Sequence, residues 1–304
     1  MTIPGAGNRE RGAENREPGV GSREPVAGKL SPRFWRQPLL AAAFLTAATV
    51  ASAQTPRLAN GRIEPHTTTN IARDLPQLAG TITDSGWIGY TQPIIDGNHT
   101  MCDYWNDGRT MNYSTDPIRL EPADFFFVMF RVENKEITRI RSYSANCPLD
   151  AGGKVVHWFT NVPVNDSVNY MKTFMSPNAA RRLNDSAVSV VAFTEGDQAL
   201  NELLRIAREG TTSQVKGNAL FWLAQRAGQK AVGTINAAIE NDPDTEVKKK
   251  AVFALSQLPK DEGVPRLIQQ ARTNKNPVVR KQAMFWLGQS KDPRALKFFE
   301  EILK

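Results

Sequence analysis

The sequence lacks the short motifs that mark the common hydrolases, metalloproteases and nucleotide-binding proteins. It contains no GxSxG nucleophile turn, no HExxH pair of zinc ligands and no Walker loop with its phosphate-binding lysine. A Ser/His/Asp arrangement assembled from distant residues would leave no such motif, but nothing in the sequence points to one. We therefore predict no catalytic residues and no cofactor, and the sequence favours a non-enzymatic protein.

Long apolar runs and a strong excess of one charge are also missing. The apolar run from Leu39 to Val50 is shorter than the ~20 residues that a helix needs to span a bilayer. The net charge is +7, and seven Lys or Arg against four Glu in residues 1–53 leave +4 for the remainder. This mild basicity weakly favours acidic partners and is poor evidence for nucleic-acid binding, so no nucleic-acid partner is predicted.

The short apolar run lies in a segment with the three parts of a secretory signal peptide. Arg33 and Arg36 precede it, and the small residues Ala51-Ser52-Ala53 follow it. We predict a signal peptide at 33–53, cleavage after Ala53, a secreted or periplasmic protein, and no stable membrane span after cleavage. The alternative is an N-terminal membrane anchor, which the short run disfavours.

The segment before the signal peptide carries no folding pattern. Residues 1–32 are rich in Gly, Pro, Arg and Glu and repeat no apolar residue, so a disordered extension is predicted. A basic region of this length is unusual for a signal peptide, which leaves open whether residues 1–28 are translated.

Only two cysteines, Cys102 and Cys147, occur in the chain. In an oxidising compartment an isolated pair usually forms a disulfide, and closing this loop would stabilise the fold by ~3–4 kcal/mol. The alternative is a Cys2His2 metal site completed by His99 and His157, but the spacing fits no common zinc module. We predict the disulfide and no metal.

Residues 54–164 are predicted to form a small β-rich domain stapled by this disulfide. Runs of β-branched and aromatic residues predict strands at 86–91, 125–132, 137–144 and 154–160. A turn at Glu133-Asn134-Lys135 joins the second and third into a hairpin, and we expect an antiparallel sheet. A helical spacing at 71–82 is interrupted by Pro76, which predicts a weak helix there.

A second functional hypothesis is an enzyme or small-ligand binder with its site at residues 84–160. The candidates are loop side chains, a strand histidine and a glycine pair whose amides could face an anion: His99, Tyr104, Trp105, Asp150, Gly152, Gly153 and His157. The competing interpretations are a simple turn for the glycine pair and a structural role for His157. Convergence of these side chains in one pocket would favour the ligand hypothesis.

The C-terminal part, residues 165–304, repeats with a period of 32 residues. The segment that begins at Val215 returns at Val247 and at Val279. In the last unit, two helices of apolar spacing are separated by Gly288 and by Asp292-Pro293, where Asp292 is expected to cap the second helix. Asn241-Asp242-Pro243 and Asn276-Pro277 close off the preceding units in a similar way. The register predicts four helical hairpins after a half unit, and stacking of these hairpins into an α-solenoid. The whole chain is therefore predicted as α+β.

The same register predicts how the last helix packs. Leu296, Phe299 and Leu303 continue the apolar rows of the preceding second helices, so they are expected to be buried. Phe298 and Ile302 are then expected to point outward.

These units resemble the HEAT-repeat family, particularly the short bacterial units of its lyase-like subgroup. The resemblance is carried by the Val-Arg/Lys step, the Ala and Leu of the first helix, and the Asp-Pro before the second. It implies a bacterial α-solenoid that binds another protein. Some relatives attach bilins, but no bilin-specific signature is present here. Gly-Trp-Ile-Gly-Tyr and Cys-Pro-Leu-Asp-Ala-Gly-Gly also resemble the front halves of secreted bacterial HEAT-repeat proteins, which implies no established activity.

Two recurring features form a candidate partner-binding surface. Phe221, Phe253 and Phe285 share one position of the repeat, and an exposed aromatic row would be a strong binding surface. The alternative is that these rings pack between adjacent units. The second feature is the basic step of the repeat, at which the family often pairs with an acidic residue of a neighbouring unit: Lys216, Lys248 and Arg280. The leading hypothesis is a secreted, non-enzymatic protein-binding scaffold.

Overall fold

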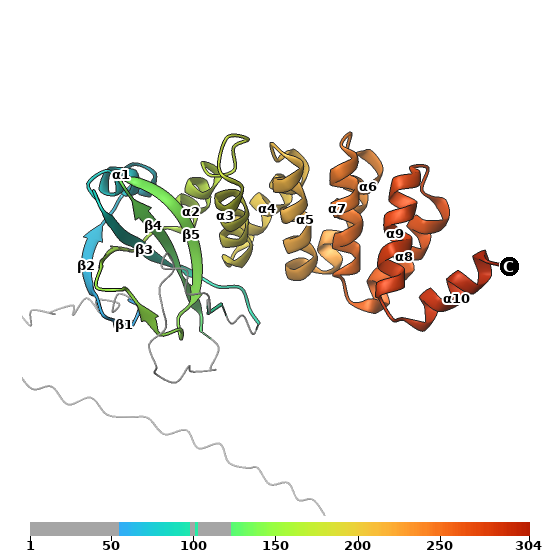
Figure 1. The fold of residues 1–304 in the computed structure, drawn as a ribbon, viewed down its shortest axis with the longest axis horizontal. Coiled ribbons are helices and arrows are strands. Elements are labelled where there is room, and N and C mark those ends of the chain that lie inside the picture. The colour runs from blue at the N-terminus through green and yellow to red at the C-terminus, as the bar shows by residue number, and fades with distance from the viewer. Residues whose placement is uncertain (1–54, 98–100, 103–122) are drawn as a thin grey trace, which may run out of the picture. The chain divides into compact units, whose positions relative to one another are not determined.

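The computed structural model describes residues 55–97, 101–102 and 123–304 (Figure 1). A small β-sheet region is followed by a series of paired helices, so the α+β class is confirmed. Within these residues, no helix combines the length and the apolar character that crossing a membrane requires.

The main sheet has five strands in the order β2-β7-β3-β4-β5. The strands are β2 (Arg62–Thr67), β3 (Ser85–Pro93), β4 (Phe125–Glu133), β5 (Glu136–Ser144) and β7 (Val155–Thr160). β3, β4 and β5 are antiparallel, as expected, whereas β7 is parallel to both β3 and β2. The sheet is mixed because the chain crosses from β5 at one edge to insert β7 beside β3.

That crossover contributes one strand, β6, to a second, two-stranded sheet. β1 (Leu58–Ala59) pairs in parallel with β6 (Leu149–Asp150). The disulfide joins Cys102 to Cys147 just before β6, with the two Cα atoms 5.6 Å apart. The predicted disulfide is therefore present.

Local chemistry explains the hairpin and the close packing of the sheet. Asn134 and Lys135 both have positive φ, 51° and 69°, as a tight two-residue hairpin turn requires. Gly89 of β3 allows a close approach, because a Cβ there would lie 2.5 Å from Met129 Sδ and 2.7 Å from Trp158 Cζ3.

The helix α1 (Ile71–Ala79) forms although Pro76 lies inside it. Ile71, Leu75 and Ala79 fall on one helical face and are all buried. The Asn70 side chain accepts a hydrogen bond from the Arg73 amide and caps the first turn. Burial of one face therefore outweighs the hydrogen bond that the proline removes.

A half unit and four helical hairpins follow the sheet, as the repeat predicts. The half unit is α2 (Val164–Lys172), and the hairpins are α3 (Arg181–Phe193) with α4 (Asp197–Glu209), α5 (Ser213–Ala227) with α6 (Gln229–Asn241), α7 (Thr245–Ser256) with α8 (Lys260–Thr273), and α9 (Pro277–Gln289) with α10 (Pro293–Ile302). The first helices α3, α5, α7 and α9 lie side by side in sequence order (Figure 1).

One hydrophobic core connects the sheet with the helices. It extends from Ile71 of α1 to Phe298 of α10. At the start of the repeats, the Tyr90 hydroxyl of β3 and the Ser167 hydroxyl of α2 are 2.9 Å apart and buried. Burial raises the pKa of Tyr90, so this phenol stays neutral. The half unit thus packs directly on the sheet.

The last helix buries and exposes different residues from those that the repeat predicts. Phe298 is only 2% exposed, whereas Leu296 is 63% and Leu303 83% exposed, so these three predictions are wrong. The equivalent residues of α8, namely Val264, Leu267 and Ala271, are buried. α10 contacts α8 and α9 and buries Ala295 and Phe298, and the Arg272 guanidinium lies 5.1 Å from the Phe298 ring centre.

The N-cap of α10 is formed as predicted. Asp292 Oδ1 accepts a hydrogen bond from the Arg294 amide, and Pro293 occupies the first turn. The Arg294 guanidinium also donates to this carboxylate and lowers the pKa of Asp292 to about 2.

Candidate functional site

A line of six aromatic rings crosses the first helices of all four hairpins. We call it the aromatic ladder, and its rings come in the order Phe193, Trp222, Phe221, Phe253, Trp286 and Phe285. The centroids of successive rings are 4.8, 5.0, 5.8, 4.8 and 4.9 Å apart. These are the separations at which aromatic pairs attract one another.

The ladder follows from the repeat together with helix geometry. Phe221, Phe253 and Phe285 occupy the same position of successive units, so stacking of the units brings them into one line. Trp222 and Trp286 follow the first and the third of them and fill the gaps between units. The phenylalanines were predictable from the repeat, whereas the role of the tryptophans depends on how adjacent helices pack.

The ladder is neither fully buried nor fully exposed. Phe285 at its α9 end is 52% exposed, and the other five rings are half-buried. The Phe221 and Phe253 rings stack with an angle of 3° between their planes. The rings therefore pack between units, as one interpretation predicts, and still present an aromatic edge to solvent.

Polar side chains line the ladder on the side towards the C-terminal ends of these helices. Gln225 Nε2 donates to Gln257 Oε1 at 3.4 Å, and Gln289 is exposed at the next equivalent position. A pocket of about 190 Å³ between α7, α8 and α9 begins here and includes Trp286 in its lining. The indole N–H of Trp286 is buried and finds no acceptor among the described residues.

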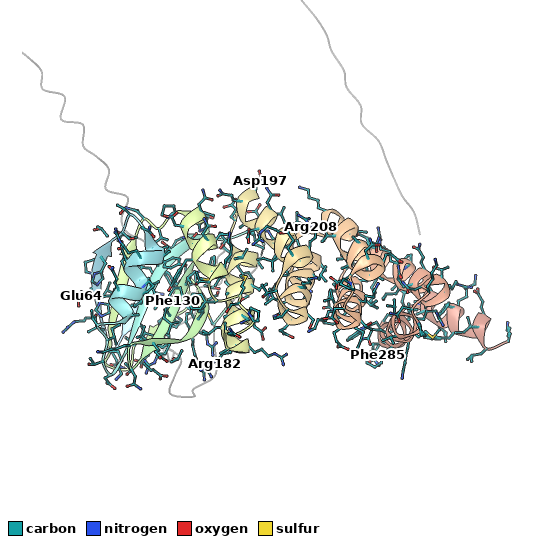
Figure 2. The ribbon with its side chains drawn as sticks, turned by 90° about the horizontal axis from the view of Figure 1, so that it is seen from above. Glu64, Phe130, Arg182, Asp197, Arg208 and Phe285 are labelled. Atoms are coloured by element: carbon teal, nitrogen blue, oxygen red, sulfur yellow. A yellow bond between two sulfur atoms is a disulfide. The ribbon has the colours of Figure 1, made fainter. Side chains whose placement is uncertain are left out.

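The opposite flank of the ladder carries an excess of positive charge. Arg182 and Lys281 are exposed there, and Lys250 Nζ donates to Gln214 Oε1 at 2.9 Å. Partial burial lowers the pKa of Lys250. Asp185 offsets part of this charge and accepts a hydrogen bond from Gln214. Figure 2 shows Arg182 and Phe285 on the same side of the helices, with Asp197 and Arg208 of α4 on the other.

The basic step of the repeat acts inside the array and not on this surface. Lys216 Nζ lies 2.7 Å from Asp242 Oδ2 in the connection between α6 and α7, and both side chains are largely buried. Lys248 Nζ donates to the carbonyl oxygens of residues 239 and 240 at the end of α6. Arg280 donates to the carbonyl oxygen of Asn274 just after α8. Cations at helix C-termini stabilise those ends.

Among the candidates in the sheet region, the structure places the glycine pair in a tight turn. Gly152 and Gly153 have φ of 61° and 77°. The Gly152 amide donates to Asp150 Oδ1 at 2.8 Å, and the Gly153 amide donates to the carbonyl oxygen of Asn60. Both amides are thus engaged within the protein. His99, Tyr104 and Trp105 lie outside the described residues.

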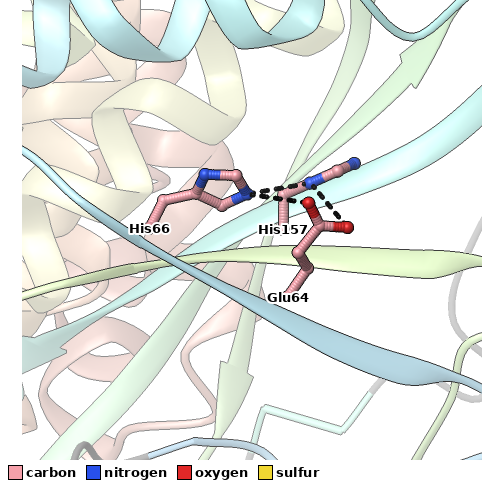
Figure 3. Close-up of side chains that lie close together, drawn as sticks. All are labelled: Glu64, His66 and His157. Atoms are coloured by element: carbon pink, nitrogen blue, oxygen red, sulfur yellow. Dashed lines mark hydrogen bonds and ion pairs between the residues drawn. The ribbon is translucent and has the colours of Figure 1, made fainter.

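His157, the remaining candidate, belongs to a small cluster at the sheet edge (Figure 3). His66 Nε2 lies 3.0 Å from His157 Nδ1, and the Glu64 carboxylate lies 3.9 Å from the same His157 nitrogen. Burial, followed by the charges of His66 and Arg62, lowers the pKa of His157, against the opposing effect of Glu64. We refer to Glu64, His66 and His157 as the edge cluster.

Sequence reasoning did not find the other two members of this cluster. Residues 62–67 carry Pro65 and only one large aliphatic side chain, so they do not show the apolar pattern of a strand. The alternation of Arg62, Glu64 and His66 on one face was the available signal. The Cys2His2 alternative is excluded, because both cysteines are in the disulfide.

Comparison with known proteins identifies the helical part. Residues 200–283 and 236–304 match the model of HEAT repeats. Human deoxyhypusine hydroxylase is 17% identical over 41% of this chain and 43% of its own, with a TM-score of 0.32. The CpcE–CpcF complex of phycocyanin lyase from Nostoc sp. PCC7120 is 16% identical over 46% and 90%, with a TM-score of 0.35.

These similarities are too low to bear on function, and this chain spans less than half the length of the deoxyhypusine hydroxylase chain. No curated protein sequence matches the chain. The family match and the stacked hairpins agree on the helical part: residues 200–304 match HEAT repeats and form stacked helical hairpins.

Proposed function

We propose that this protein is a secreted or periplasmic, non-enzymatic scaffold that binds another protein along the aromatic ladder. The observation that carries the proposal is a continuous, partly exposed row of six rings on a HEAT-repeat array. Aromatic side chains dominate the binding energy of many protein interfaces, because they bury a large area at a low entropic cost. HEAT repeats are commonly protein-interaction modules.

The surroundings of the ladder indicate what kind of segment it binds. The rings provide apolar contacts at intervals set by the repeat, and the exposed Gln225 and Gln289 offer hydrogen bonds to a partner's backbone. Arg182 and Lys281 on the opposite flank favour acidic side chains. The preferred partner segment has apolar anchors along the ladder and acidic residues on its basic side.

The proposed secreted or periplasmic location is supported by two features of the chain. The segment 33–53 has the basic, apolar and small-residue parts of a signal peptide. The disulfide between Cys102 and Cys147 agrees with this, because such bonds persist in oxidising compartments and are rare in the cytosol. Amino-terminal sequencing of the exported protein tests the location, and a mature chain that begins well before Gln54 contradicts cleavage after Ala53.

The binding proposal is tested with residues 54–304, immobilised and exposed to envelope extract of the source cell. A partner retained by the unaltered chain is purified and titrated against Phe285→Ala and against Leu303→Ala. Both side chains are large, apolar and exposed, but only Phe285 belongs to the ladder.

We expect Phe285→Ala to weaken binding by about 30-fold, corresponding to ~2 kcal/mol for a hot-spot aromatic, with no change for Leu303→Ala. The absence of any saturable partner, or an equal loss for both variants, refutes the proposal.

A further inference from the structure

We infer that the edge cluster is a binding site for a divalent transition-metal ion such as Zn²⁺, held by Glu64, His66 and His157. A ring nitrogen of each histidine and a carboxylate oxygen all lie within 4.8 Å of one another. This is a two-histidine, one-carboxylate ligand set, which suits zinc and related ions. The inference does not depend on the protein-binding proposal, since the cluster lies on β2 and β7.

The backbone of two paired strands holds the three side chains together. Glu64 and His66 are two residues apart on β2, so both project from one face of the sheet. His157 on β7 is the register partner of Glu64, and the alternation along β7 places it on that same face. The backbone hydrogen bonds between β2 and β7 therefore position the ligands before any ion binds.

The distances are close to those of a coordinated ion. Zinc–nitrogen bonds of about 2.1 Å at tetrahedral angles place two ligand nitrogens roughly 3.4 Å apart. His66 Nε2 and His157 Nδ1 are 3.0 Å apart. The nearest carboxylate oxygens of Glu64 are 4.0 and 3.9 Å from these two nitrogens. These are two different oxygens, and one oxygen of Glu64 lies within 4.8 Å of both nitrogens. Glu64 thus has to approach by up to ~1.5 Å to coordinate through one oxygen, and its side chain, 49% exposed, is free to do so.

The lone pairs and charges of the three side chains suit a cation. Without one, two neutral imidazoles at this distance share a single N–H as a hydrogen bond. Protonation of both rings would place two positive charges side by side. A cation accepts the lone pairs of both nitrogens at once and neutralises the carboxylate, which explains why three such side chains converge.

Access and ion type follow from burial and ligand chemistry. His66 is 26% and His157 16% exposed, so the site opens to solvent on one side. Three protein ligands leave at least one coordination position for water. Imidazole nitrogens favour zinc-like ions over Ca²⁺ and Mg²⁺, which prefer oxygen ligands. Arg62, two residues before Glu64 on the same strand face, opposes the binding of a cation.

The test is calorimetric titration of ZnCl₂ into the disulfide-intact chain from residue 54, purified without a histidine tag and treated with chelator. We expect one ion per chain. His66→Ala and His157→Ala should each weaken binding by at least ~100-fold, beyond the loss typical of outer-sphere changes. Glu64→Gln should weaken it less, because an amide oxygen is a poorer ligand, and Arg62→Gln should strengthen it.

The matched control is His99→Ala, since His99 is the one further histidine of the chain. Its binding curve should equal that of the unaltered chain. Circular dichroism of each variant confirms that the fold is kept, and Co²⁺, whose visible absorption reports nitrogen and oxygen ligation, provides a second readout. No binding by the unaltered chain, or binding that persists when either His66 or His157 is replaced, overturns the inference.

Discussion

The packing of α10 provides the sharpest test of the structure, because the repeat pattern and the structure make opposite predictions for its residues. The repeat places Leu296 in the core and Phe298 outside, whereas the structure exposes 63% of Leu296 and 2% of Phe298. Replacing each residue in turn by alanine therefore distinguishes the two packing modes in a single experiment.

The expected magnitudes follow from burial. Phe→Ala at a buried site typically costs ~3–5 kcal/mol. α10 is covered on one side only, so the surroundings of Phe298 can relax, and we expect about 3 kcal/mol for Phe298→Ala. Leu296→Ala removes a side chain that already contacts water, and its effect should stay within about 0.5 kcal/mol.

The assay is urea-induced unfolding of the disulfide-intact chain, combined with hydrogen exchange of the α10 amides. Exchange is needed because a repeat array can unfold one hairpin at a time. Phe298→Ala should accelerate exchange in α10 far more than Leu296→Ala does. The reasoning is refuted if Leu296→Ala is as costly as Phe298→Ala, since α10 would then pack in the register of the other second helices.

Three further predictions concern the rest of the fold. Reducing the disulfide should lower the free energy of unfolding by about 4 kcal/mol, because the bond closes a loop with a sequence separation of 45 residues; identical urea midpoints for the oxidised and reduced protein would contradict this. Gly89→Ala should destabilise the fold by ~1–3 kcal/mol or more, because its Cβ would lie 2.5 and 2.7 Å from two core side chains. Gly288→Ala in α9 is the control: its new Cβ meets nothing within 4 Å, so this variant should be neutral or stabilising. Thermal unfolding of both variants measures the difference. The pKa of Asp292 is lowered from 3.8 to about 2 by Arg294, so the charge of Asp292 stabilises the fold above pH ~4, and this contribution is lost as the pH falls through about 2. Asp292→Asn keeps the helix cap but removes that charge, so melting curves of the two proteins should converge in acid, and a constant difference between them would argue against the ion pair.

Much of the helical architecture was predictable because it depends on local and periodic signals. The 32-residue period places the four hairpins, and Asp292 caps the helix that it was expected to begin. The disulfide was predictable because only two cysteines exist. The hairpin of β4 and β5 was predictable because its turn and both strands are contiguous in the sequence.

The candidate sites were less predictable, because they depend on contacts between distant residues. The edge cluster joins β2 to β7 across about 90 residues, and β2 carries no apolar strand pattern. The basic step was considered as a binding surface, but Lys216, Lys248 and Arg280 bond to helix ends and a hairpin connection within the array. A side chain of that length reaches partners that only the packing of neighbouring hairpins brings near.

The amino-acid sequence by itself therefore determined the period of the array, its division into helical hairpins, the central hairpin of the sheet and the phenylalanine row. These features arise from residues close in the chain or repeated at a constant interval, and such interactions need no knowledge of the whole fold. Tertiary structure alone decided the parallel insertion of β7, the choice of residues that α10 buries and the meeting of Glu64, His66 and His157. Each of these features depends on which surface a segment packs against, and that surface is formed by residues far away in the chain.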